Sequence, residues 1–177
     1  MTTRLTPRDF DDAFRYFRRD AFRLEARPVY TVDVEREAFD DYLRGEPRPA
    51  TDYDYYATWL EKVREVTAAG RRLERVRIIE TPPTDYQAFE LHMARYNVAA
   101  GETLRTISRP DAVEAGLPAD TDWWLFDSEA VAVMRFADDG TPLGGTILTD
   151  PAIVSRYCTW RDLAVHHSAP FTSSAAA

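Results

Sequence analysis

The chain has 177 residues, of which 45% are hydrophobic and 29% charged, and this composition excludes a fibrous repeat or a chain that is disordered throughout. The single cysteine, Cys158, excludes a disulfide framework and a cysteine-rich zinc site. The formal net charge of -8 disfavours a duplex-DNA binder, because such proteins use clustered positive charge to neutralise phosphates. The length predicts one domain over residues 1–171 and a frayed tail over 172–177.

The N-terminus has no apolar run of signal-peptide length, and no segment approaches the ~18 apolar residues of a membrane span. We therefore expect a soluble, cytoplasmic protein that does not bind a membrane.

The first half of the chain is predicted to alternate helices with extended segments. Thr6-Pro7 is typical of a helix start, and Phe10, Phe14 and Phe17 follow at helical spacing, so they are predicted to face the core. Two further helices are expected over 35–44, burying Phe39 and Leu43, and over 52–69. An extended segment is predicted between them and the first helix, over residues 22–32 and broken at Pro28.

The middle of the chain predicts a βαβ unit. Strands are expected over 75–80 and 103–107. Between them, Thr84 and Gln87 form a capping box that starts a long helix, and Gly101 ends it. A strand, helix and strand joined by short links should have parallel strands and a right-handed crossover.

The last third predicts an antiparallel meander followed by a helix. Strands are expected over 123–126, 130–136 and 145–148, with a hairpin turn at Asp138-Asp139-Gly140, and Asp150-Pro151 begins the final helix. The predicted fold is α+β: a mixed sheet with a βαβ unit and a C-terminal antiparallel meander, flanked by about five helices.

Motifs that would carry catalysis, a metal or a cofactor are missing from the sequence. Cys158 lies mid-helix, where a small buried apolar residue is the ordinary interpretation, and the adjacent His166 and His167 cannot face one metal from a regular helix. No HExxH, CxxC, GxGxxG or P-loop pattern occurs. We therefore assign no catalytic residue, metal or cofactor.

Two groups of side chains are candidates for a contact surface. The first is a basic cluster around the first helix, made of Arg15, Arg18, Arg19 and Arg23. The second is aromatic and includes Tyr53 and Tyr55, which are expected to be exposed. Trp123 and Trp124 are consecutive in a strand, so one ring is expected in the core and the other on the opposite face as a binding anchor.

A second basic cluster straddles a predicted helix end, and a solvated face is its ordinary interpretation; it comprises Arg71, Arg72, Arg75 and Arg77. An alternative to the contact surface is a pocket near the βαβ unit, with Arg77, Glu90 and His92 as its first candidates.

The ending DPAIVSRYCTWRDLA (150–164) and the segment LPADTDWWLFDSEAVAVMRFADDG (117–140) resemble an actinobacterial family described only as a domain of unknown function. The likeness extends over segments 21–39 and 86–107 and so over nearly the whole chain. Its members look like cytoplasmic proteins encoded beside small helix-turn-helix regulators, and the resemblance therefore implies a regulatory or accessory role. It carries over no catalytic residue.

The order of strand, long helix, strand and hairpin is also similar to one half of a phospholipase D-like domain. The signature of that superfamily, His-x-Lys-x4-Asp, would place Asp120 at the histidine, Asp122 at the lysine and Asp127 at the final aspartate. The first two departures remove the nucleophile and the phosphate-binding cation, so this resemblance implies an inactive site.

These observations favour a non-enzymatic regulatory or accessory interaction module that acts with a helix-turn-helix regulator. The alternative is an enzyme or small-molecule-binding protein with an unrecognised site on a phospholipase D-like scaffold that lacks the His/Lys signature. Nucleic acid is an unexpected partner, and a homodimer is compatible with each interpretation.

Overall fold

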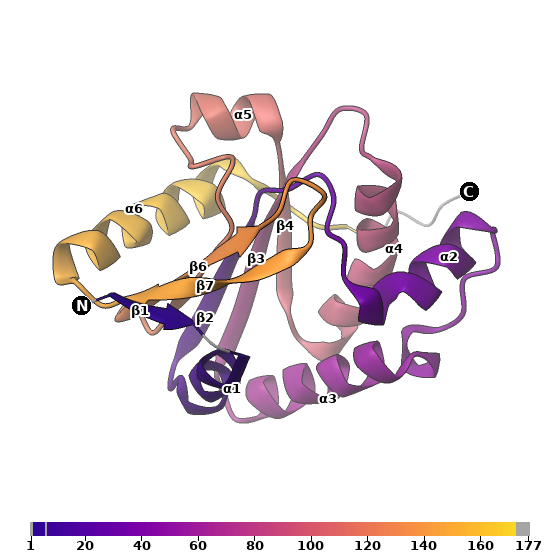
Figure 1. The fold of residues 1–177 in the computed structure, drawn as a ribbon, viewed down its shortest axis with the longest axis horizontal. Helices are drawn as coiled ribbons and strands as arrows, with labels where there is room; N and C mark the ends of the chain where they lie inside the picture. Colours follow the sequence, from indigo (N-terminus) through magenta and orange to yellow (C-terminus); the bar gives the residue numbers. More distant parts are fainter. Residues whose placement is uncertain (1, 6, 173–177) are drawn as a thin grey trace.

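The computed structural model describes residues 2–5 and 7–172, with side chains described from Asp12 onward. This part of the chain forms one eight-stranded mixed sheet in the order β1-β7-β6-β5-β2-β3-β4-β8 (Figure 1). The strands are β1 (Thr2–Leu5), β2 (Asp20–Glu25), β3 (Arg72–Ile79), β4 (Thr103–Ser108), β5 (Trp123–Phe126), β6 (Ala130–Phe136), β7 (Pro142–Leu148) and β8 (Ala169–Pro170).

Six α-helices cover the two faces of the sheet within the described residues. They are α1 (Pro7–Tyr16), α2 (Arg36–Leu43), α3 (Asp54–Ala68), α4 (Asp85–Ala100), α5 (Arg109–Glu114) and α6 (Pro151–His167). Two short 3-10 turns, Asp33–Glu35 and Ala50–Asp52, precede α2 and α3.

The parallel part of the sheet is β2-β3-β4, and the remaining pairs are antiparallel. Two consecutive right-handed crossovers in one direction place their helices on one face, and α3 and α4 accordingly pack on the same side, with α1 and α2 beside them (Figure 1). Helices α5 and α6 cover the other face. The result is a sheet between two helical layers, with a core on each side.

The period of two along each strand distributes side chains between the two cores. In β2, Phe22 and Leu24 pack under α5 and α6, whereas Ala21 packs under α1 and α3. In β5, Trp123 packs in the core under α5 and α6, and Trp124 packs in the core under α1 and α3. Arg23 and Glu25 alternate with Phe22 and Leu24, so they lie on the face that α3 and α4 cover.

The predicted α+β class, the βαβ unit and the C-terminal meander are confirmed. The crossover helix α4 begins at Thr84 with the predicted capping box and ends at Gly101, which is left-handed with a φ of 111°. The β6–β7 hairpin turns at the predicted Asp138-Asp139-Gly140.

Several predicted details are wrong or incomplete. The extended segment 22–32 is a shorter strand that ends at Glu25, and Leu43 is 53% exposed because α2 covers the core with Ala38 and Phe39 instead. The structure adds β1, β8 and the six-residue α5, which lacks the length for a periodic pattern. The side chain of Phe10 and tail residues 173–177 lie outside the described parts, and the single domain over 1–171 stays a prediction.

No helix among the described residues combines the length and the apolar composition that crossing a membrane requires.

The glycine that ends α4 allows a test of how closely α3 packs against the end of this helix. A Cβ at Gly101 would lie 2.7 Å from Thr67 Oγ1 and 3.0 Å from Thr67 Cβ, and the backbone is left-handed there. Gly45 is also left-handed, with a φ of 76°, but a Cβ there would meet nothing within 4 Å. We expect Gly101→Ala to lower the free energy of unfolding by ~2–4 kcal/mol and Gly45→Ala by ~1 kcal/mol in urea denaturation. Equal losses would contradict the close packing of α3 on the end of α4.

Candidate functional site

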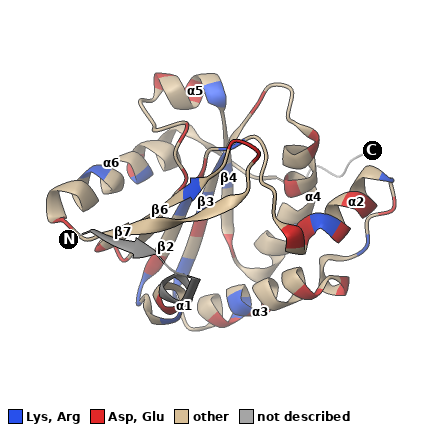
Figure 2. Cartoon of the chain, in the orientation of Figure 1, with Lys and Arg blue, Asp and Glu red and all other residues tan. Residues whose placement is uncertain are grey.

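Charged side chains lie on the covered face of the central strands. The parallel register pairs Arg23 with Arg75 and Glu25 with Arg77, so all four project toward α3 and α4. In Figure 2 the strands β2 and β3 carry blue segments in the middle of the fold. Burying charge is unfavourable unless it is paired, and these residues are paired with one another.

Glu25 is the centre of this network and contacts three arginines. Its Oε1 lies 2.7 Å from Arg75 Nη1 and 2.9 Å from Arg23 Nε, and its Oε2 lies 2.5 Å from Arg77 Nε. Burial opposes ionisation of Glu25, but the charges of Arg75, Arg77 and Arg23 outweigh it and hold the pKa well below its ordinary value. Glu25 is therefore a carboxylate at neutral pH.

Two further glutamates complete the pairing of the buried arginines. Arg75 Nε donates to Glu102 at 2.7 Å, and Arg77 pairs with the carboxylate of Glu90 on α4 and donates to its carbonyl oxygen at 2.8 Å. Trp124 lies under the guanidinium groups of both Arg23 and Arg75, at 5.1 and 5.9 Å from the ring centre.

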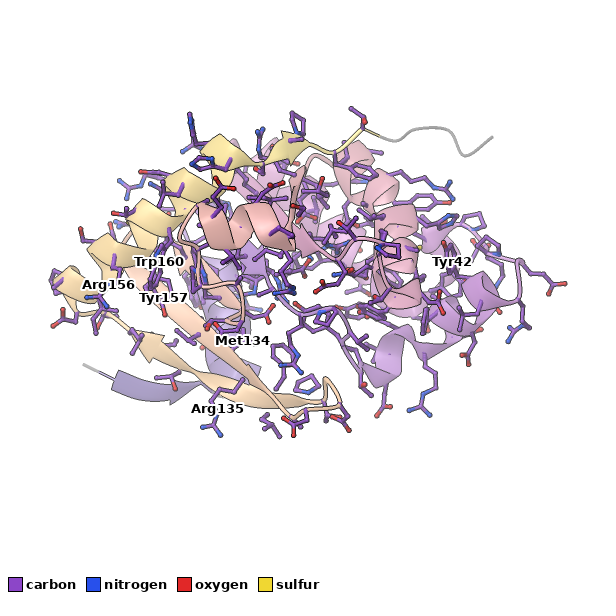
Figure 3. All side chains as sticks on the ribbon, turned by 90° about the horizontal axis from the view of Figure 1, so that it is seen from above. Tyr42, Met134, Arg135, Arg156, Tyr157 and Trp160 are labelled. Atoms are coloured by element: carbon purple, nitrogen blue, oxygen red, sulfur yellow. The ribbon has the colours of Figure 1, made fainter. Side chains whose placement is uncertain are left out.

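A cavity of about 210 Å³ opens above this network, between the sheet and helices α3 and α4. It lies toward the carboxyl ends of β2 and β3, beside the antiparallel strand β5, a position where open α/β sheets place ligands. Tyr55 and Pro142 line it and are exposed, so the cavity reaches the surface there. Met134 of β6 also lines it, whereas its neighbour Arg135 points outward in Figure 3. The lining also includes Arg23, Glu25, Tyr30, Val32, Glu35, Tyr56, Trp59, Arg75, Arg77, Tyr86, Glu90, Met93, Asn97, Trp124 and Phe136.

The cavity wall includes two buried polar groups that have neither a hydrogen bond nor an ion pair with any other described residue. The hydroxyl of Tyr56 and Oδ1 of Asn97 make no hydrogen bond to any other described residue, although the two residues are only 5% and 6% exposed. Buried polar atoms are nearly always hydrogen-bonded, and an unsatisfied one costs ~1–3 kcal/mol. The wall of the cavity is therefore polar at two points that the folded chain itself does not satisfy.

Glu35 enters the cavity from the turn before α2. Its Oε2 accepts a hydrogen bond from Tyr86 Oη at 2.6 Å, and no arginine or lysine of the described chain lies within ion-pair distance. Burial, followed by the negative charge of Glu90, raises the pKa of Glu35 to about 8. Glu35 is thus mostly protonated at neutral pH in the unliganded cavity.

The predicted basic cluster is divided by the structure. Arg15, Arg18 and Arg19 are exposed around the end of α1, and Arg18 and Arg19 pair with Glu129 at 2.8 and 3.4 Å. Arg23 instead belongs to the buried network, with its side chain 15% exposed. The four arginines do not form one surface, because β2 carries Arg23 into the sheet.

The prediction of an exposed tryptophan anchor is wrong. Trp123 and Trp124 do lie on opposite faces, but helices cover both faces and the two residues are 0% and 2% exposed. Tyr53 is also buried, with its hydroxyl donating to Asp41 at 2.8 Å, whereas Tyr55 is 41% exposed. The second basic cluster is divided as well: Arg75 and Arg77 are buried and do not form a solvated face.

The structure brings together two of the three residues proposed for an alternative pocket. Arg77 and Glu90 pair in the cavity. His92 is on α4 but faces away from the cavity. Its ring centre lies 5.2 Å from that of Tyr42, which Figure 3 labels, and its Nε2 lies 2.8 Å from Arg95 Nη2.

Sequence reasoning missed Glu25, Glu35, Tyr56 and Asn97. The signal was present for Glu25, since charged residues alternate with apolar ones in the strands over 23–25 and 75–77.

The remaining candidates take part in packing or lie at the surface. Cys158 is half-buried on α6 and packs against the core under α5 and α6. His166 and His167 are exposed in the last turn of α6. In Figure 3 their helix presents Tyr157 and Trp160 together, and these rings are 4.9 Å apart at their centres.

The three aspartates aligned with the phospholipase D signature are spread over the fold. Asp127 accepts hydrogen bonds from the backbone N–H groups of Arg18, Arg19 and Asp20 at 2.8, 2.7 and 3.2 Å, so it fastens the β5–β6 turn to the start of β2. Asp122 is buried and accepts from Ala26 N at 3.2 Å and from the hydroxyl of Tyr30. Asp120 is exposed. Two of these carboxylates are thus occupied by structural hydrogen bonds.

Comparison with known proteins shows a family and a fold. The model of a family described as a domain of unknown function (DUF6879) matches residues 8–175. No curated protein matches the sequence. Among solved structures, Nuc from Salmonella typhimurium, a phospholipase D family member, is similar over 98% of this chain and 99% of that chain, with a TM-score of 0.56 and 10% identity. NucT from Helicobacter pylori is similar over 97% and 99% of the two chains, with a TM-score of 0.49 and 10% identity.

The likeness to Nuc confirms the predicted phospholipase D-like resemblance at the level of the fold. The actinobacterial origin and the neighbouring helix-turn-helix regulators stay predictions.

The buried network predicts an unequal response to the loss of two carboxylates. Glu25→Gln should lower the free energy of unfolding by ~3–5 kcal/mol, because it leaves three buried guanidinium groups without their shared anion. The control Glu129→Gln removes an exposed partner of Arg18 and should change it by no more than ~1 kcal/mol. Denaturant titration at pH 7 measures both values. A loss for Glu25→Gln no larger than for Glu129→Gln would contradict the pairing.

The raised pKa of Glu35 predicts that stability falls as the pH rises from about 4.5 to about 8. In this window the folded chain retains a proton that the unfolded chain, with an ordinary pKa of 4.5, has released. Glu35→Gln removes this dependence. The free energy of unfolding of the variant should therefore rise relative to that of the wild type by up to ~4 kcal/mol between pH 4.5 and pH 8. Urea denaturation in steps of pH measures the difference. A difference that does not vary with pH would mean that Glu35 has an ordinary pKa.

Proposed function

The chain belongs to the DUF6879 family, a domain of unknown function, and we propose that it is a small-molecule-binding domain whose ligand occupies the cavity between β2, β3, α3 and α4. The observation that carries this proposal is the pair of unsatisfied polar groups, Tyr56 Oη and Asn97 Oδ1, in the wall of a cavity that reaches the surface. A polar ligand that hydrogen-bonds to both would remove their desolvation cost.

The size and lining of the cavity support a small and polar ligand. A volume of about 210 Å³ lies below the ~300–1,000 Å³ of sites for drug-sized molecules, so the ligand has the size of an amino acid or smaller. Aromatic walls with a few convergent polar groups are typical of binding sites. The ion pairs on the sheet hold the floor of the cavity rigid, which lowers the entropic cost of binding.

The lining favours binding over nucleophilic catalysis. Among the described residues that line the cavity there is no serine, threonine, cysteine, histidine or lysine. Its titratable groups are glutamates, tyrosines and arginines, and the three arginines are paired with carboxylates. These groups suit recognition of a ligand through hydrogen bonds and charge.

The interaction with a helix-turn-helix regulator stays a prediction, as does a homodimer. The contact surface proposed for it reduces to Arg15, Arg18 and Arg19 at the end of α1, because Arg23 and the two tryptophans are buried. A ligand-binding domain fits such a regulatory role, because ligand binding can change the affinity of the domain for a partner protein.

Thermal denaturation with a panel of small polar compounds tests the proposal. The panel contains amino acids, amines, sugars and short carboxylates of about the size that the cavity admits. We expect at least one compound to raise the melting temperature of the wild type in a concentration-dependent manner. No shift with any compound would contradict a ligand site in this cavity.

The variant Tyr56→Phe separates a binding role from a structural one. It removes an unsatisfied hydroxyl, so the free energy of unfolding should stay constant or rise by ~1 kcal/mol, whereas the stabilisation by a panel ligand should fall. The matched control is Tyr53→Phe on the same face, whose hydroxyl bonds to Asp41 at 2.8 Å; it should lose ~1 kcal/mol and keep the ligand response. A loss of stability in Tyr56→Phe with an unchanged ligand response would mean that the hydroxyl only supports the fold.

A further inference from the structure

We propose that the ligand of this cavity is a small organic cation, an amine or quaternary ammonium, whose charged group lies between the carboxylate of Glu35 and the tyrosine rings around it. The inference rests on the proposed function and narrows it to one class of ligand. It follows from the balance of charge in the buried network, from the lack of an ion pair at Glu35 within the described chain, and from tyrosine rings over which no described arginine or lysine lies.

The buried network contains more acids than bases. Its guanidinium groups are those of Arg23, Arg75 and Arg77, and its carboxyl groups are those of Glu25, Glu35, Glu90, Glu102 and Asp122. Three cations therefore face five acids. Burial raises the pKa of Glu90 and of Asp122 as well as that of Glu35, so protons partly compensate the excess of negative charge. A cationic ligand would supply the missing positive charge directly.

Glu35 forms no ion pair with the arginines of this network. Glu25, Glu90 and Glu102 each form an ion pair with Arg75 or Arg77, and Asp122 accepts hydrogen bonds from Tyr30 and Ala26. Within the described chain, Glu35 accepts a single hydrogen bond, from Tyr86. The second carboxyl oxygen of Glu35 is thus available to a cation in the cavity. Glu35 lines this cavity together with Tyr55 and Tyr56.

The aromatic wall provides a second, independent indication. Tyr30, Tyr55, Tyr56 and Tyr86 line the cavity, and no described arginine or lysine lies over any of their rings. Their rings adjoin one another, at 5.9 Å for Tyr30 and Tyr86 and 5.3 Å for Tyr55 and Tyr56. Several adjoining ring faces beside a carboxylate form the environment that stabilises ammonium groups.

An anionic ligand is disfavoured in spite of the three arginines. Arg75 and Arg77 each contact two carboxylates, and Arg23 contacts Glu25 and lies over Trp124. An anion would have to displace these partners or add a further negative charge to a network that already has an excess of acids. A cation requires no ion pair to break.

The protonation of Glu35 makes the proposal sensitive to pH. The groups that face Glu35 are Tyr55 and Tyr56 from α3, Tyr86 and Glu90 from α4, Glu25 from β2 and Arg77 from β3. Because its pKa is about 8 without ligand, a cation must displace a proton at pH 7. Affinity should therefore fall by up to tenfold for each pH unit below 8, with release of up to one proton per ligand bound.

Calorimetry and thermal denaturation with paired probes test the inference. The cations are methylammonium and choline, the neutral isostere of choline is 3,3-dimethylbutan-1-ol, and acetate is the anionic probe. At pH 8 we expect a cation to bind the wild type at least tenfold more tightly than the neutral isostere or acetate. Titrations at pH 7 in two buffers of different ionisation enthalpy should show proton release on binding.

Two variants and a matched control assign the effect to Glu35. Glu35→Gln should lower cation affinity at least tenfold and abolish proton release, whereas Glu37→Gln, an exposed neighbour that pairs with Arg48, should behave as the wild type. Tyr86→Phe keeps the ring but removes the hydrogen bond that lowers the pKa of Glu35, so the pH dependence of binding should move to higher pH. That displacement would not arise from a purely structural role.

The outcomes separate this inference from the proposed function. If acetate or the neutral isostere binds as tightly as the cations, or if Glu35→Gln binds cations as the wild type does, the cationic ligand is refuted and the binding site stands. The proposed binding site would then be supported by a panel compound that stabilises the wild type and stabilises Tyr56→Phe less. If neither these probes nor any panel compound binds the wild type, both proposals are wrong.

Discussion

The contact of one carboxylate, that of Glu25, with three guanidinium groups is the interaction on which the rest of this structure depends. Strands β2 and β3 both carry charged side chains on the sheet face that helices α3 and α4 cover. Without Glu25, the adjacent Arg23, Arg75 and Arg77 would repel one another in a medium of low polarity. The pairing allows helices α3 and α4 to close over a polar surface, and a cavity of about 210 Å³ remains between the helices and the sheet.

The same network defines what the cavity can hold. Its arginines are already paired, so they form a rigid floor and leave Glu35, Tyr56 and Asn97 as the groups that have capacity for a ligand. The fold resembles that of a phospholipase D family member, but Asp127 and Asp122 use their carboxylates to hold backbone and tyrosine groups. The cavity, and not the scaffold, therefore carries the function proposed for this chain.

Local signals in the sequence were sufficient for most of the fold and for little of the site. The capping box at Thr84, the turn at Asp138-Asp139-Gly140 and the strand pattern over 130–136 act over a few residues, and the structure has all three elements. The exposed tryptophan anchor and the solvated Arg75 are wrong predictions, because exposure depends on which helices cover each face of the sheet, and that follows from tertiary packing. The prediction that groups Arg77 with Glu90 is right because both lie within the predicted βαβ unit, on its first strand and its helix. Glu35, distant in sequence and without a motif, is brought to Tyr86 only by the path of the chain between β2 and α2.

The most direct test of a cation site in this cavity is a pair of crystal structures, grown with and without choline at pH 8. The account predicts density for the cation in the cavity, with its nitrogen against the carboxylate of Glu35 and its polar end hydrogen-bonded to Tyr56 or Asn97. Ordered water that satisfies Tyr56 and Asn97 equally in both crystals, with Glu35 unchanged, would contradict it.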